Sequence, residues 1–117
     1  MRAQTIRRGD IFFAELPHGT GSVYYGVRPV LIISNNSNNT YSHTVTAIPL
    51  TSKNKNHLPT HVTISAENGL RVDSTVMCEN ICNYSTDILR EKITSIDENS
   101  FVMKKIEKAV RIQLGIA

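Results

Sequence analysis

The sequence lacks long apolar runs and internal repeats, and it contains few cysteines. A membrane-spanning helix needs about 20 consecutive apolar residues, and no segment of the chain approaches this length. The first eight residues are positively charged, but no apolar stretch follows them, so they do not have the pattern of a secretory signal. We therefore expect a cytoplasmic protein that does not contact a membrane.

The two cysteines, Cys78 and Cys82, are expected on a single strand. Residues four apart on a strand lie about 13 Å from each other, which is beyond disulfide reach, so we expect two reduced thiols. A zinc site would need the pair together with His43, His57 or His61, but a Cys-x-x-x-Cys spacing is not typical of zinc ligands. We predict neither a metal nor another cofactor.

The length and composition indicate one ordinary globular domain. The chain has 117 residues, which suits a single core, and we assign residues 1–117 to one domain. Hydrophobic residues make up 40% and charged residues 20%, so extended disorder is not expected. The formal net charge of +3 would attract a polyanion such as a nucleic acid, without showing that one is bound.

Short alternating segments separated by turn residues predict several strands followed by one helix. Strands are expected at residues 10–16, 30–33, 44–50, 60–64, 74–82 and 89–96, although the last segment also fits a helix, and an Asn-rich loop is expected at 34–40. Asp97 fits a helix N-cap, flanked by Ile96 and Phe101 as a hydrophobic staple, and Gly115 fits the helix end. The predicted fold class is mainly β: a small antiparallel barrel with a C-terminal helix packed on it.

The strand at residues 30–33 is apolar throughout, which is typical of a strand covered on both faces. Pro29 cannot donate a ladder hydrogen bond, so we expect it at the first position of this strand, with Arg28 held extended at the strand entrance. A guanidinium in this position could make a forked contact with a phosphate. The alternative is an arginine that reaches water over its aliphatic stem. Pro49, in the following strand, is expected at a bulge or an edge.

Two connections are rich in residues suited to binding a polyanion. The first, residues 17–25, ends in Tyr24 and Tyr25, which could stack on bases or anchor the core, and the connection could also be a plain surface loop. The second combines hydroxyl donors with positive charge, although solvated loops often have this composition. Its residues are Thr51, Ser52, Lys53 and Lys55.

Four segments follow one another with a characteristic spacing. They are Arg-Gly-Asp-Ile-Phe-Phe-Ala-Glu-Leu at 8–16, Gly-Ser at 21–22 with Gly-Val-Arg-Pro-Val-Leu-Ile-Ile-Ser-Asn at 26–35, Pro-Leu-Thr-Ser at 49–52, and Leu-Pro-Thr-His-Val at 58–62. Gly-Leu at 69–70 and Leu-Gly at 114–115 extend the pattern. As an ordered set, these segments resemble the MazF/PemK family of toxins of toxin–antitoxin systems. The resemblance covers nearly the whole chain.

The resemblance implies a homodimeric SH3-like (PemK/CcdB-like) barrel that cuts single-stranded RNA at short sequences without a metal. The implied products are a 2′,3′-cyclic phosphate and a 5′-hydroxyl, and the implied inhibitor is a cognate antitoxin that covers the RNA groove. By this resemblance Arg28 and Thr51 are the catalytic pair. The implied RNA-binding residues are Ser22, Tyr24, Tyr25, Ser52, Lys53, Lys55, His61, Glu79 and Asn80.

The residue types fit this chemistry. RNA carries its own nucleophile, the 2′-hydroxyl, so the protein has mainly to hold the phosphate in line and stabilise its developing charge. Arg28 and Thr51 together can supply such stabilisation. Histidine is well suited to accept a proton near neutral pH, so His61 could be the general base, and a structural histidine on a strand is the other interpretation.

The sequence departs from the family pattern at two places. Many members carry a glutamate where Val23 stands and a basic residue where Cys82 stands. We expect these changes to alter base preference first and to weaken activity second. Two other hypotheses about the function stay open. The protein could be a non-cleaving toxin that uses the same barrel and its C-terminal helix to bind a topoisomerase, or an inactive relative of the toxins that still binds an antitoxin.

Overall fold

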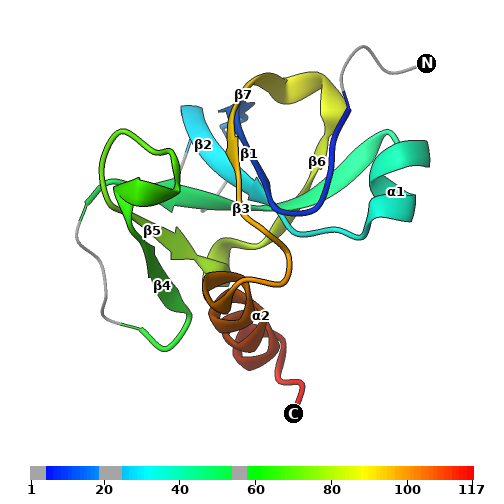
Figure 1. Cartoon of the computed structure of the whole chain (residues 1–117). Helices are drawn as coiled ribbons and strands as arrows, with labels where there is room; N and C mark the ends of the chain where they lie inside the picture. Colours follow the sequence, from blue (N-terminus) through cyan, green and yellow to red (C-terminus); the bar gives the residue numbers. More distant parts are fainter. Residues whose placement is uncertain (1–4, 19–24, 54–57) are drawn as a thin grey trace.

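The computed structural model describes residues 5–18, 25–53 and 58–117. Within them the chain forms a curled antiparallel sheet with a C-terminal helix packed against it (Figure 1). Neither of its α-helices is long and apolar enough to cross a membrane, as judged on these same residues. The strands are β1 (Asp10–Leu16), β2 (Gly26–Ile32), β3 (Thr44–Thr51), β4 (His61–Ile64), β5 (Ser74–Met77), β6 (Cys82–Ser85) and β7 (Leu89–Ser95). The helices are α1 (Asn36–Tyr41) and α2 (Phe101–Leu114), with short 3-10 turns η1 (Ala66–Asn68), η2 (Cys78–Asn80) and η3 (Thr86–Ile88).

The sheet confirms the predicted fold class, although the barrel is not closed. Its strand order is β4-β5-β3-β2-β1-β7, and β6 pairs with β3 outside this path. β3 therefore has three partners: β6 along its first half, β2 along its middle and β5 at its end. This shared strand joins the two parts of the sheet and brings the ends of β2, β3 and β5 close together.

The second half of β2, from Val30 to Ile32, is covered on both of its faces, as its apolar sequence predicts. Leu31 belongs to the core cluster under α2, whereas Val30 and Ile32 belong to a second cluster that contains Phe12 of β1. None of these side chains is exposed. Each such side chain contributes about 1.5–3 kcal/mol through burial, so β2 is anchored from two sides.

The positions of the two prolines correct the sequence-based expectation. Pro29 is the fourth residue of β2, not the first, and Arg28 pairs with Ala14 inside the ladder between β1 and β2. Pro49 lies within β3, opposite Val30, at neither a bulge nor an edge. Pro29 lies opposite Phe13 of β1, one residue before β2 begins to pair with β3, and Pro49 is the last β3 residue that pairs with β2 before β3 pairs with β5.

Two other segments differ from the predictions. Helix α1 at Asn36–Tyr41 takes the place of most of the loop predicted at 34–40, and the Asn35 side chain caps it by accepting a hydrogen bond from the Asn38 backbone N–H. The predicted strand at 74–82 is divided into β5, η2 and β6. Cys78 and Cys82 therefore do not share a strand, and both are free thiols, Cys78 buried and Cys82 exposed.

Helix α2 begins three residues later than predicted. Ser100 is its N-cap and accepts a hydrogen bond from the Met103 backbone N–H at 3.2 Å. Asp97 instead caps the preceding turn, where its carboxylate accepts from the Asn99 N–H at 2.8 Å. Phe101 is 73% exposed, so no staple with Ile96 forms. The helix ends at Gly115, as predicted.

The N-terminal turn ties β1 to the helix and to the end of β2. Arg8 pairs with Glu107 of α2 at 2.7 Å, and its Nε donates to the Ile33 carbonyl at 3.1 Å. The Gly9 N–H donates to the Ile32 carbonyl, and the Gly9 carbonyl accepts from the Ile96 N–H. Only a residue without a side chain fits at Gly9, because the backbones of Ile32 and Ile96 close around it.

We expect Gly9→Ala to destabilise the fold. Gly9 has a φ of +97°, and an added Cβ would lie 2.2 Å from the Ile96 backbone oxygen. Gly115→Ala is a matched control, since Gly115 also has a positive φ but open space at the Cβ position. The control should lose about 1–2 kcal/mol of the free energy of unfolding for its backbone conformation, and Gly9→Ala about 1–3 kcal/mol more for overpacking. Urea denaturation measures both, and equal losses would contradict the steric argument.

Candidate active site

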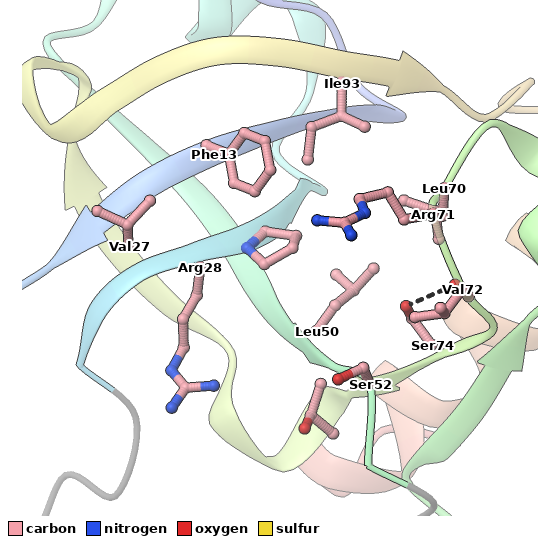
Figure 2. Close-up of a pocket in the computed structure, with 12 residues that line it drawn as sticks. Phe13, Val27, Arg28, Leu50, Ser52, Leu70, Arg71, Val72, Ser74 and Ile93 are labelled. Carbon is pink, nitrogen blue, oxygen red and sulfur yellow. Dashed lines mark hydrogen bonds between the residues drawn. The ribbon is translucent and has the colours of Figure 1, made fainter.

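A cavity of about 410 Å³ opens where β2, β3 and the connection from η1 to β5 meet. Figure 2 shows it with the side chains that surround it. Its lining is mostly apolar, and among these described residues two are arginines and none is a carboxylate. The lining residues are Phe13, Val27, Arg28, Pro29, Leu50, Thr51, Ser52, Leu70, Arg71, Val72, Ser74 and Ile93.

Arg28 reaches the cavity from β2. Its Nε donates to the Tyr25 carbonyl at 3.1 Å, which fixes the plane of the guanidinium. The residue is half-buried, and its pairing with Ala14 holds its backbone in the sheet. Arg28 is thus a permanent cation on a rigid element, and a guanidinium is a side chain that can bind an anion through forked hydrogen bonds.

Thr51 is the last residue of β3 and pairs with Thr75 of β5. It is only 4% exposed, and its Oγ1 accepts a hydrogen bond from the Lys53 backbone N–H at 3.2 Å. A hydroxyl that already accepts one bond keeps its proton to donate to another group. Because Thr51 and Ser52 line the same cavity as Arg28, the structure brings the predicted catalytic pair to one site.

A second cation, Arg71, lines the cavity and was not among the predicted site residues. It follows the left-handed Gly69 and lies on the connection between η1 and β5. Figure 2 shows its guanidinium directed across the cavity toward the side of Phe13 and Ile93. In the sequence, Arg71 is a basic residue in a turn after Gly69, and many surface loops have this pattern. The sequence alone therefore did not identify it as a site residue.

The other predicted RNA-binding residues are distributed around this site. Tyr25 is 49% exposed, and its ring contacts that of His18 with centroids 3.9 Å apart. Lys53 is exposed beside Thr51 but does not line the cavity. Ser22, Tyr24 and Lys55 lie outside the described residues, as does Val23.

His61, Glu79 and Asn80 do not line this cavity. His61 Nε2 lies 2.7 Å from Glu79 Oε2, and the Thr60 hydroxyl donates to Glu79 Oε1 at 2.9 Å. The His61 side chain is 5% exposed. Glu79 of η2 therefore binds both Thr60, which precedes β4, and His61, the first residue of β4, and the geometry supports a structural role for His61.

Two pKa shifts occur around η2. Burial acts to raise the pKa of Glu79, but hydrogen bonds from its own backbone, His61 and Thr60, together with the charge of His61, outweigh it and the pKa is lowered. Burial, with the nearby Glu79 charge, raises the pKa of the Cys78 thiol to about 12. Cys78 is therefore an inert thiol in the core and not a nucleophile. Among the described residues, no three His, Cys, Asp or Glu side chains gather in a group that could hold a metal ion.

The chain is similar to a family of known proteins along nearly its whole length. The model for a PemK-like, MazF-like toxin of type II toxin–antitoxin systems matches residues 7–114. The chain is 38% identical over 113 residues to the endoribonuclease EndoA of Bacillus subtilis, with 95% of this chain and 96% of that relative covered.

Two solved structures have the same fold. An endoribonuclease from a mycobacterial species, in complex with its cognate antitoxin, superposes with a TM-score of 0.73 at 26% identity, covering 97% of this chain and 96% of that one. MazF of Deinococcus radiodurans has a TM-score of 0.81 at 21% identity, covering 97% and 99%. The second likeness concerns the fold alone.

We expect the link between β4 and η2 to weaken in acid. Because the folded-state pKa of Glu79 is lowered, its carboxylate stabilises the native state above the ordinary value of 4.5, and this contribution is lost as the pH falls through the lowered pKa. Wild type should therefore be more stable than Glu79→Gln at pH 7, with a difference that shrinks as the pH falls from 4.5 through the lowered pKa. Urea midpoints across this range measure it. A difference independent of pH would contradict the role given to the charge.

Proposed function

The chain belongs to the PemK-like, MazF-like toxins of type II toxin–antitoxin systems and is an endoribonuclease of that family. We propose that it cuts single-stranded RNA at short specific sequences without a metal ion. The residues that we assign to this reaction are Arg28 and Thr51. One observation carries the proposal. A guanidinium from β2 and a hydroxyl from the end of β3 line a single cavity. Both groups are donors that can stabilise the charge on the non-bridging oxygens of a pentacoordinate transition state.

In the proposed reaction the 2′-oxygen of one nucleotide attacks the adjacent phosphorus while the bond from phosphorus to the 5′-oxygen breaks. The products are a 2′,3′-cyclic phosphate and a 5′-hydroxyl, with one proton leaving the 2′-hydroxyl and one reaching the 5′-oxygen. Arg28 binds the non-bridging oxygens as they gain charge, and the Thr51 hydroxyl donates to one of them. Both groups are already held in place, Arg28 by the Tyr25 carbonyl and Thr51 by the Lys53 N–H, so little reorganisation accompanies the reaction.

His61 is a weaker candidate for the proton acceptor than its residue type suggests. Its side chain is 5% exposed and close to Glu79, and it does not line the cavity. We assign His61 to the structure of the sheet and only Arg28 and Thr51 to the reaction.

The proposed partners are single-stranded RNA, a cognate antitoxin and a second copy of the chain, and the proposed location is the cytoplasm. The mycobacterial relative is a complex with its cognate antitoxin, which supports an antitoxin for this chain. The cavity favours a nuclease over the alternative of a non-cleaving toxin that binds a topoisomerase. A toxin that does not cleave would not need Arg28 and Thr51 at the same cavity.

We expect purified protein to cut a long single-stranded RNA at discrete sites in the presence of EDTA. Arg28→Ala should lower the rate by about 10²–10³-fold, as for loss of a main oxyanion donor, and Arg28→Lys should recover only part of it because the forked geometry is lost. Thr51→Val should lower the rate, and Thr51→Ser should retain most of it. Lys104→Ala, which removes an exposed cation on α2, is the control. Discrete cuts that persist in Arg28→Ala would overturn the assignment.

A change in the RNA substrate tests whether the 2′-hydroxyl is the nucleophile. An RNA that carries a single 2′-deoxy nucleotide on the 5′ side of the cut should resist cleavage at that site, because the attacking oxygen is missing. The same RNA should still be cut at its other sites, which serves as an internal control. Cleavage at the deoxy position, or a product that ends in a 5′-phosphate, would instead indicate attack by water.

A further inference from the structure

We propose that the cavity holds one RNA base next to the cleaved linkage and that Arg71 reads the hydrogen-bond acceptors on the edge of this base. The inference rests on the proposed function and adds a residue that determines specificity. Arg71 is suited to this because it lines the cavity that contains Arg28 and Thr51 but reaches it from a separate segment.

The walls of the cavity favour a base over a phosphate. Phe13, Leu50, Leu70 and Ile93 give it an apolar surface, and its volume is about 410 Å³. A base has two apolar faces that gain from burial, whereas a phosphate would lose its hydration against such walls. With the cleaved phosphate at Arg28, an attached base can enter this adjoining space.

Arg71 has the donors to recognise a base inside this space. Figure 2 shows its guanidinium directed over the apolar side chains, with Arg28 extending along another edge of the cavity. A guanidinium donates and cannot accept, so it selects an edge with two neighbouring acceptors, such as O6 and N7 of guanine, over an edge that carries an amino group. No ion pair joins Arg71 to a carboxylate among the described residues.

The backbone that carries Arg71 is fixed on both sides. Gly69 has a φ of +101°, and an added Cβ there would lie 2.5 Å from the Thr94 hydroxyl. The Thr94 hydroxyl itself donates to the Asn68 carbonyl at 2.9 Å. On the other side, Asp73 accepts from the Ala66 N–H at 2.7 Å, which closes the connection into a loop. Specificity needs such support, because a loosely held donor discriminates poorly between bases.

The test compares the sequences that wild type, Arg71→Gln and Arg71→Lys select from a pool of randomised single-stranded RNA, with every cut mapped by sequencing. Arg111→Gln is the matched control, because Arg111 is an exposed arginine on α2 that does not line the cavity. Thermal unfolding of each variant checks that the fold is retained. Cleavage is also measured at two salt concentrations.

We expect both Arg71 variants to keep cutting RNA while the preference at one position beside the cut relaxes by about 5- to 100-fold, the discrimination that one forked contact provides. Arg111→Gln should keep the wild-type preference. An unchanged preference in Arg71→Gln would overturn the inference. The inference would also be overturned if Arg71→Gln lowered the cleavage rate equally for all sequences, with a weaker salt dependence, and Arg71→Lys restored the rate. Such a result would identify Arg71 as a phosphate contact.

The inference and the proposed function fail in different ways. If wild type cuts no RNA, the proposed function is wrong and the inference falls with it. If wild type cuts with a sequence preference that is indifferent to Arg71, only the inference is wrong.

Discussion

The pairing of β2 with β3 is the constraint on which the candidate site depends. Val30, Leu31 and Ile32 pair with Pro49, Ile48 and Ala47, and this register places Arg28 and Thr51 on adjacent strands beside one cavity. A slip of one residue would turn the β2 side chains to the opposite face. Burial of Leu31 in one core cluster and of Val30 and Ile32 in the other prevents such a slip, so the two cores fix the geometry of the site.

Much of the fold could be predicted from sequence where the signal is local. β1 follows a clear apolar pattern bounded by turn residues, and the apolar run of β2 matches its burial on both faces, whereas the sequence of β7 also fits a helix. The predictions were wrong where the same residues fit more than one local structure. Asn35 is both a turn former and a helix cap, and Asp97 and Ser100 are both good N-caps three residues apart. The break after β5 depends on distant contacts, because the Cys78 N–H donates to the Thr60 carbonyl and Glu79 binds Thr60 and His61.

The site itself could be predicted only in part. Resemblance to a family gave Arg28 and Thr51, and the structure places both at one cavity, although their catalytic roles stay a proposal. Arg71 could not be found, since its relation to the cavity depends on how the connection after Gly69 folds over Leu50 and not on any periodic pattern. In the same way, nothing in the sequence near His61 indicates that Glu79 engages it.

Contacts between distant parts of the chain form the wall of the cavity and hold the N-terminal segment against β7 and α2. Phe13 of β1 and Ile93 of β7 form part of its wall, Asp10 pairs with Ser95, and Arg8 is bound to Glu107. Contacts of such large sequence separation form late, because the loop between them must first be closed. The cavity of a nascent chain therefore lacks part of its wall until β7 has been synthesised and has paired with β1.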